Sequence, residues 1–249
     1  MDTRVIRVVV VDDEAPARRL IAEYLSKRAD IEIVAECADG FAAVRALTEL
    51  RPDLVLLDIQ MPRLNGFEVL ELVENRLPVI FITAHDEHAV RAFEVHAIDY
   101  LLKPFTEERL ASALERALAR IGQGEFPDPR EIAAEQAAVS GRLLGRVLVR
   151  DGSKVHVIPI DKIDYFEAQD DYVAIRSEGR SHLKKQKLGV LEASLDPGRF
   201  VRIHRSCILN VERLAAVELY ARDSRVAVLT DGTRLPVSRA GHARLKELL

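Results

Sequence analysis

The sequence contains no tryptophan, and aromatic residues make up only 5% of its 249 positions. A platform of stacked aromatic side chains, as used to bind single-stranded nucleic acid, would therefore be thin. The chain also lacks any apolar run near the roughly 18 residues that a membrane-spanning helix needs, so we expect no membrane partner. Residues 1–4 lead directly into a strand-like run, unlike a secretory signal peptide, and we expect a cytoplasmic protein.

Cysteine is also scarce, with Cys37 and Cys207 as the only two. Two thiols so far apart in the sequence do not indicate the disulfide framework of a small secreted protein. They also fall short of the paired cysteines of a zinc site. We expect Cys207 to pack in a core rather than to act as a redox sensor.

The net charge of −4 conceals a division along the chain. Residues 1–120 carry 15 Lys and Arg against 22 Asp and Glu, a net of −7. Residues 121–141 carry 1 against 4, and residues 142–249 carry 20 against 14, which gives nets of −3 and +6. An acidic first half and a basic second half predict two domains with different partners, the second partner being a polyanion.

The first half alternates short apolar runs with amphipathic stretches. This pattern predicts an α/β domain in residues 1–121, with an open, doubly wound parallel sheet of five strands, as in flavodoxin-like folds. Ligands of such sheets bind at the carboxyl ends of the strands. The expected strands cover residues 5–11, 31–37, 53–58, 78–83 and 98–102, and the expected helices cover residues 14–28, 40–50, 66–75, 87–95 and 106–121.

Polar residues follow four of the five expected strands. Asp12, Asp13 and Glu14 follow the first, Asp58 ends the third, Thr83 ends the fourth and Lys103 follows the fifth. Clustered carboxylates repel one another unless a cation neutralises them, and Mg²⁺ prefers such oxygen ligands. A central carboxylate beside Mg²⁺, a hydroxyl and a lysine suits phosphoryl transfer to that carboxylate.

Each of these residues also has a plainer interpretation when it is taken singly. An Asp or Thr at a strand end is most often a cap or turn residue. Tyr100, in the fifth expected strand, would by itself be interpreted as a half-buried packing residue. It is the set that favours a functional site. His85, His88 and His96 could suggest a second metal site, but their spacing is typical of an exposed helix and its loop.

The strand-end set, together with Asp58-Ile59-Gln60-Met61-Pro62, resembles the receiver domain of two-component response regulators. The resemblance implies phosphorylation by a sensor histidine kinase and homodimerisation through the fourth helix, fifth strand and fifth helix. It also implies a cis peptide bond before Pro104. The implied roles are phosphoacceptor for Asp58, Mg²⁺ binding for Asp12 (through water), Asp13, Asp58 and the backbone carbonyl of Gln60, phosphoryl contact for Lys103, and a switch pair for Thr83 and Tyr100.

Residues 122–142 combine glycine, proline and an alanine-rich stretch without apolar periodicity, and they predict a linker. From residue 143 the apolar pattern changes to a period of two. Turn signals occur at Asp151-Gly152-Ser153 and Asp231-Gly232-Thr233. Helical patterns are confined to residues 188–195 and 238–248. We therefore expect a mostly antiparallel β domain over residues 143–249.

Basic side chains in this second domain could contact DNA phosphates, and arginine can also read guanine in the major groove. The alternative is that most of these charges are simply solvated. His204 alone would be a packing or hydrogen-bonding residue. The candidates are Lys184, Lys185, Lys187, Arg202, Arg205 and Arg239.

The order of motifs from Ile163 to Asn210, including the segment FVRIHRSCILN, resembles the LytTR DNA-binding domain of the LytR/AlgR/AgrA family. In that family, loops of a β fold enter successive major grooves of direct repeats in promoter DNA. The resemblance implies DNA contacts for Arg205 and Arg239, and for one of the residues Gln169, Asp170, Asp171 and Tyr172. We expect His204 to contact DNA as well, and Lys184, Lys185 and Lys187 to contact its backbone. Two adjacent aspartates near phosphate leave the target base sequence open.

These observations together predict a response regulator that is phosphorylated on Asp58 and binds double-stranded DNA to regulate transcription. The receiver would assist only its own phosphorylation and dephosphorylation, so we do not expect an enzyme in the usual sense. Two alternatives remain at this stage. One is an aspartyl-phosphate phosphatase, and the other is an output domain that binds RNA or protein.

Overall fold

The structure is a computed structural model, and it describes residues 4–73, 77–84, 97–123, 143–152, 154–221 and 224–248. The chain forms two compact units, residues 1–140 and 141–249. This division falls within the expected linker, most of which lies outside the described residues. None of the described helices combines the length and apolarity that crossing a membrane requires.

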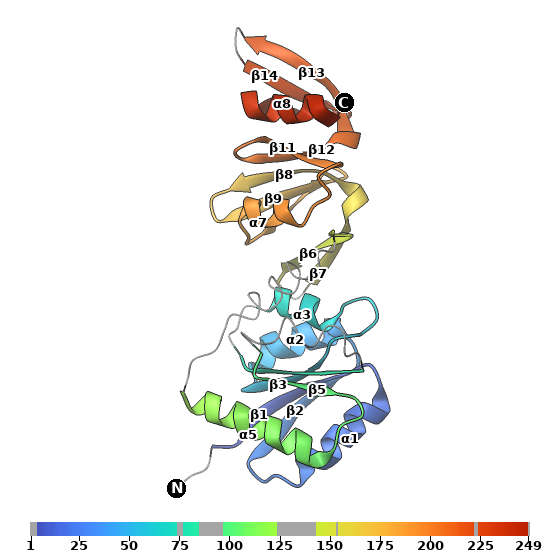
Figure 1. The fold of residues 1–249 in the computed structure, drawn as a ribbon, viewed down its shortest axis with the longest axis vertical. Coiled ribbons are helices and arrows are strands. Elements are labelled where there is room, and N and C mark those ends of the chain that lie inside the picture. The colour runs from blue at the N-terminus through green and yellow to red at the C-terminus, as the bar shows by residue number, and fades with distance from the viewer. Residues whose placement is uncertain are drawn as a thin grey trace. The chain divides into compact units, whose positions relative to one another are not determined.

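The first unit contains a five-stranded parallel sheet in the order β2-β1-β3-β4-β5 (Figure 1). The predicted doubly wound fold class is therefore confirmed. The helix expected at residues 87–95 lies outside the described residues. The strands are β1 (Ile6–Val11), β2 (Ile31–Cys37), β3 (Leu54–Asp58), β4 (Val79–Thr83) and β5 (Asp99–Leu102), and the helices are α1 (Ala15–Ser26), α2 (Gly40–Leu50), α3 (Gly66–Leu72) and α5 (Glu107–Gln123).

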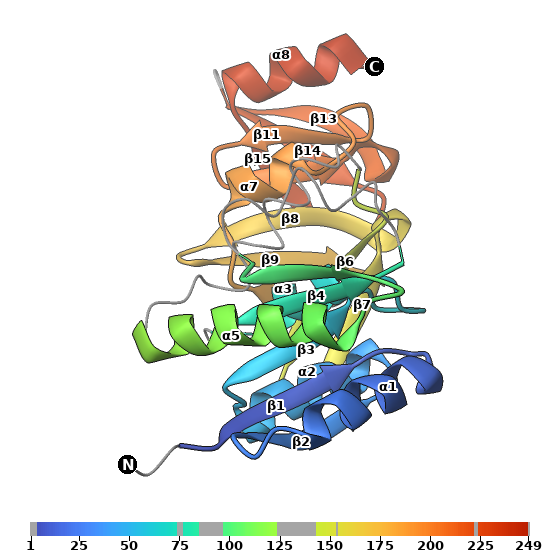
Figure 2. The same cartoon turned by 60° about the horizontal axis from the view of Figure 1, so that its bottom comes forward.

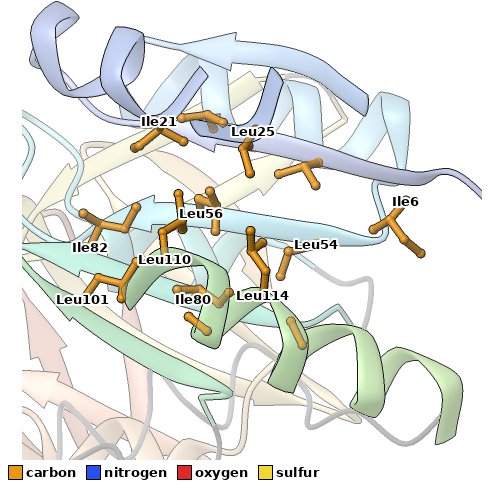
Figure 3. Close-up of a cluster of buried hydrophobic side chains, with 14 residues drawn as sticks. Ile6, Ile21, Leu25, Leu54, Leu56, Ile80, Ile82, Leu101, Leu110 and Leu114 are labelled. Atoms are coloured by element: carbon orange, nitrogen blue, oxygen red, sulfur yellow. The ribbon is translucent and has the colours of Figure 1, made fainter. Parts of the chain in front are cut away.

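Helices cover both faces of this sheet, which explains why its central strands are apolar without alternation. Helices α1 and α5 lie on one face and α2 and α3 on the other (Figure 1). Figure 3 shows Ile21 and Leu25 of α1 and Leu110 of α5 directed at Leu56 and Ile82 of the central strands. Each such side chain contributes about 1.5–3 kcal/mol on full burial, so this packing holds the strand ends in place.

The second unit is built from antiparallel strands in three sheets, with orders β10-β9-β8-β12-β11, β13-β14-β15 and β6-β7. The predicted mostly antiparallel class is confirmed. The strands are β6 (Arg146–Asp151), β7 (Lys154–Pro159), β8 (Ile163–Gln169), β9 (Tyr172–Ser177), β10 (Arg180–Lys184), β11 (Phe200–His204), β12 (Cys207–Asn210), β13 (Leu214–Ala221), β14 (Ser224–Leu229) and β15 (Arg234–Val237), and the helices are α7 (Leu188–Ala193), α8 (Arg239–Leu248) and the 3-10 turns Ile160–Lys162 and Val211–Arg213.

Strand β9 departs from a strict period of two, because Ala174 is buried as well as Val173 and Ile175. The small Ala174 is paired with the longer Leu183 of β10 on one side and Glu167 of β8 on the other; Figure 2 shows β8 and β9 side by side. Cys207 is buried in the core that also contains Leu245 of α8. Both cysteines are free thiols, and burial raises the pKa of Cys207 to about 12.

Candidate functional sites

The first candidate site lies at the carboxyl edge of the parallel sheet. Strands β1, β3, β4 and β5 are consecutive neighbours in the sheet and run in the same direction. Their ends therefore meet at one edge, as the fold class requires. The residues placed there are Asp12 and Asp13 after β1, Asp58 at the end of β3, Thr83 at the end of β4 and Lys103 after β5.

The three aspartates form one acidic cluster. One carboxylate oxygen from each of Asp12, Asp13 and Asp58 lies within 4.8 Å of the others. Nζ of Lys103 lies 2.7 Å from Oδ2 of Asp12 and 2.8 Å from Oδ2 of Asp58. Asp12 and Asp58 are buried, whereas Asp13 is exposed and leaves the cluster open to solvent.

One lysine does not neutralise this cluster. Burial raises the pKa of Asp58, and the hydrogen bonds from Lys103 and from the backbone N–H of Gln60 offset this only in part. Burial also opposes the charge on Lys103, but its contacts with Asp12 and Asp58 outweigh that effect and raise its pKa. The site therefore keeps an ammonium group and an excess of carboxylate charge close together.

The cluster fits a hard divalent cation. Oδ2 of Asp12 is buried, and its one close partner among the described residues is the Lys103 ammonium group, which it shares with Asp58. Three carboxylates beside one ammonium group keep an excess of negative charge, which a further cation would offset. All the candidate ligand atoms are oxygens, which is the donor set that Mg²⁺ prefers.

The loop after Asp58 is held by a glycine. Gly66 begins α3, and its N–H donates to the carbonyl of Ile59 at 2.9 Å. A Cβ at this position would lie only 2.5 Å from the carbonyl oxygen of Asp58. Asn65 and Glu68 form a capping box at the start of the same helix. The sequence thus places α3 directly against the backbone that carries Asp58.

Thr83 and Tyr100 lie on adjacent strands at this edge. The carbonyl of Thr83, which is buried, accepts a 2.7 Å hydrogen bond from the N–H of Lys103. Tyr100 is half-buried in β5, where it stands opposite Phe81 of β4. The peptide bond between Lys103 and Pro104 is cis, as the receiver resemblance implied. The three histidines weighed as a second metal site lie outside the described residues.

The second candidate site lies at one end of the sheet β10-β9-β8-β12-β11. The register pairs Lys184 with Val173, Gln169 with Tyr172, Glu167 with Cys207, and His204 also with Cys207. These pairs place the ends of all five strands together. Lys184, Lys185, Tyr172, His204 and Arg205 are therefore gathered at that end, although they come from separate parts of the sequence.

Arg205 occupies the tight turn between β11 and β12 and is exposed. The turn is braced by a 2.8 Å hydrogen bond between Nδ1 of His204 and the hydroxyl of Ser206. The N–H of Ala168 donates to the carbonyl of Ser206 at 2.8 Å. This bond connects the Arg205 turn to the hairpin of Gln169–Tyr172, which contains the candidates for the third DNA contact.

Arg239 is the exposed first residue of α8. Just before it, the Ser238 hydroxyl donates to the carbonyl of Ile203 and accepts from the N–H of Gly241, both at 3.0 Å. The helix start is thereby fixed on β11. A pocket of about 390 Å³ is lined by both Ser238 and Arg205, so the start of α8 and the Arg205 turn border the same hollow.

Comparisons with known proteins match a separate family model to each of the two units. The family model described as the response regulator receiver domain matches residues 8–115, and the LytTr DNA-binding domain model matches residues 153–249. A response regulatory protein of Yersinia pestis is 34% identical over 98% of this chain and 98% of its own length. The transcriptional regulatory protein BtsR of Escherichia coli K12 is 33% identical over 98% and 99%. This chain is a LytTR-type response regulator.

The predicted family of this response regulator is thus confirmed, as is its place among the transcriptional regulators of two-component systems. The sensory transduction protein LytT of Bacillus cereus is 31% identical over 98% of this chain and 99% of its own length. Among solved structures, the response regulatory domain of mrkE from Klebsiella pneumoniae is similar, with 32% identity and a TM-score of 0.44 over 47% of this chain and 99% of that one.

Contacts at and near the first site join further residues of this response regulator, of which the arginines were not predicted from its sequence. Oε2 of Glu14 lies 3.2 Å from Nζ of Lys103, and Arg18 donates to the carbonyl of Asp12 at 2.7 Å. Asp99 receives hydrogen bonds from Arg109 and Arg116 of α5. Glu14 was expected at this edge with Asp12 and Asp13, and its contact with Lys103 agrees with that expectation. The arginines carry no local signal, because only the fold brings them to their partners.

Proposed function

We propose that Asp58 of this response regulator accepts a phosphoryl group from a phosphohistidine of a sensor kinase. A carboxylate oxygen of Asp58 attacks phosphorus, the bond from phosphorus to the histidine nitrogen breaks, and an acyl phosphate forms. The arrangement of Asp58 with Lys103 supports this assignment. Lys103 has its ammonium group 2.8 Å from Asp58, where it offsets charge on the phosphoryl oxygens.

Asp13, Asp58 and the backbone carbonyl of Gln60 would hold Mg²⁺, with Asp12 acting through water. When bound, Mg²⁺ supplies positive charge to the phosphoryl oxygens. Asp12 and Asp13 support this proposal because their oxygens lie within 4.8 Å of the Asp58 carboxylate. The receiver would assist only its own phosphorylation and dephosphorylation, without turnover of a separate substrate.

Phosphorylation would shift a conformational equilibrium of the receiver through Thr83 and Tyr100. Thr83 lies beside the phosphoacceptor strand, and its carbonyl is bonded to Lys103, so it is well placed to respond to a phosphoryl group. We propose that the shift favours a homodimer through the face that includes β5 and α5. The fourth helix of that face lies outside the described residues.

The LytTR domain would bind direct repeats in double-stranded promoter DNA in the cytoplasm, where the DNA is. Two linked domains on two repeats gain affinity because the second binding event is intramolecular. The gathering of loops at one end of the sheet supports this proposal, since that end presents basic side chains. The proposed contacts are Arg205, Arg239, His204, Tyr172, Lys184 and Lys185.

Labelling by a small phosphodonor with Mg²⁺ tests the phosphoacceptor. We expect wild-type protein to be labelled and Asp58→Asn to take up no label. A matched control is Asp30→Asn, because Asp30 is hydrogen-bonded to Arg28 and has no part in the pocket. Persistent labelling of Asp58→Asn would remove Asp58 as the acceptor, and sustained release of phosphate over many turnovers would instead indicate a phosphatase.

Selection of bound sequences from random duplex DNA, with and without phosphodonor, tests the output. We expect a direct repeat to be enriched among the bound sequences. With phosphodonor, the same enrichment should require a lower protein concentration. Competition by RNA duplexes as effective as by the selected DNA would contradict the proposed DNA specificity.

A further inference from the structure

Arg202 of β11 is bonded through all three of its guanidinium nitrogens. Nη1 donates to Oε2 of Glu192 at 2.7 Å, Nη2 to the carbonyl of Arg205 at 2.5 Å and Nε to the carbonyl of His204 at 3.3 Å. Two of the acceptors are backbone atoms of the turn that carries Arg205. The third is the carboxylate of Glu192 in α7, the helix that precedes β11.

The geometry of β11 directs the Arg202 side chain to this place. Ile203 is fully buried, so Arg202 and His204 on either side of it project from the opposite face of the strand. The pairing of β11 with β12 is irregular between Arg202 and His204. Arg202 donates to the carbonyl of His204, which ends β11, and to that of Arg205 in the turn.

A second arginine holds the backbone of Arg202 itself. Nη1 of Arg244, in α8, donates to the carbonyl of Arg202 at 3.0 Å and lies 4.0 Å from Oε1 of Glu192. The turn is therefore connected to α7 through Glu192 and to α8 through Arg244. Helix α8 also begins with Arg239, so both proposed arginine contacts are fixed to the same framework.

We propose that Arg202, anchored by Glu192, is a positioning residue that sets the direction in which Arg205 projects toward DNA. This inference rests on the proposed function, in which Arg205 contacts DNA. A planar guanidinium with donors at fixed angles can bind a carboxylate and two carbonyls at once, whereas a lysine ammonium cannot reproduce that geometry. Glu192 is acidic and would by its charge repel DNA. Through its ion pair with Arg202 it instead favours DNA binding, because it holds the residue that positions Arg205.

The sign of the Glu192 effect separates this role from simple electrostatics. Removing an acidic residue from a DNA-binding face strengthens binding if only charge matters. Removing the anchor of Arg202 weakens specific binding if position matters. We expect Glu192→Ala to lower affinity for the selected duplex about tenfold and to leave affinity for unrelated duplex nearly unchanged.

The experiment measures affinity of the full-length protein for the selected duplex and for an unrelated duplex over a series of salt concentrations. We expect Arg202→Lys to lower specific affinity about tenfold with an unchanged salt slope, and Arg205→Ala to lower specific affinity at least as much. The matched controls are Arg199→Lys and Glu212→Ala, because that ion pair of 2.8 Å lies at the start of β11, away from the turn. Both controls should bind as wild type, and thermal unfolding checks that every variant is folded.

Wild-type affinity in both Arg202→Lys and Glu192→Ala, while Arg205→Ala is weakened, would overturn the positioning role and leave the proposed DNA contact standing. Tighter binding by Glu192→Ala would also overturn it. Unchanged binding by Arg205→Ala would instead contradict the proposed contact, and the positioning role with it. If Arg202→Lys does not fold, the Glu192→Ala result decides by its sign.

Discussion

Nζ of Lys103 lies 2.8 Å from Oδ2 of Asp58, and this contact joins the ends of β3 and β5. It does not remove the cost of the site, because burial still raises the pKa of Asp58. When the pKa of a carboxyl group is higher in the folded than in the unfolded state, ionisation of that group lowers the free energy of unfolding of the protein. Ionised Asp58 therefore lowers the free energy of unfolding of the receiver domain.

We accordingly expect Asp58→Asn to raise the free energy of unfolding at pH 7, without added metal, by about 0.5–2 kcal/mol. The gain should disappear at a pH low enough to protonate Asp58, because the wild-type residue is then neutral too. Chemical denaturation at several pH values measures it. Asp30→Asn is an opposite control, since the hydrogen bond from Arg28 lowers the pKa of Asp30 and that variant should lose stability.

Asp99 should contribute stability that acid removes. Burial opposes its ionisation, but hydrogen bonds from Arg109 and Arg116 outweigh burial and lower its pKa to about 2. This contribution is fully present above the ordinary value of 3.8 and is lost as the pH falls toward 2. Asp99→Asn should cost about 1–2 kcal/mol at pH 7. Denaturation curves of the two proteins should converge near pH 2, and an equal difference at both pH values would contradict this assignment.

Arg205→Ala and Arg239→Ala should each weaken binding to the selected duplex by about 1–3 kcal/mol. The two side chains project from a turn and from a helix start that border one pocket, so we expect both to face the same DNA. A loss confined to the selected sequence indicates a base contact, whereas an equal loss on all duplexes with a slope lowered by about 1 indicates a phosphate contact. Affinity unchanged in either variant would remove that residue from the interface.

Gly241→Ala should destabilise the LytTR domain. Its Cβ would lie 2.0 Å from the carbonyl oxygen of Ile203, so α8 would have to move away from β11. We expect a loss of about 1–3 kcal/mol, the usual range for overpacking. Gly122→Ala is the matched control, because Gly122 is also helical and a Cβ there meets nothing within 4 Å. Thermal unfolding of the two variants should therefore shift in opposite directions, since alanine favours a helix.

Much of the first site could be predicted from sequence because a parallel sheet aligns its strand ends. Once Asp12, Asp58, Thr83 and Lys103 were assigned to ends of successive strands, their meeting at one edge followed from the fold class. The bounds of β2 and α2 also agree with the apolar pattern. Strand β9 buries Val173 and Ile175, as a period of two predicts, but it also buries the small Ala174 between its paired neighbours.

The antiparallel domain offered less, since its functional residues come from turns whose neighbours depend on register. The motif around Arg205 could be recognised from sequence. The hydrogen bond from Ala168 to the carbonyl of Ser206 and the role of Glu192 could not. Likewise the contacts of Arg18 with Asp12 and of Arg116 with Asp99 join a helix to the strand or strand end that precedes it. Long side chains leave no periodic pattern, because many rotamers reach many partners.

The sequence by itself determined the division into an acidic α/β receiver and a basic β domain, since apolar periodicity and charge are properties of the chain. It also determined which residues could bind a cation and a phosphoryl group. The tertiary structure decided the balance of charge around Asp58 and the framework behind Arg205. Those depend on distances between residues far apart in the chain, and burial makes electrostatic and hydrogen-bonding interactions strongly dependent on such distances.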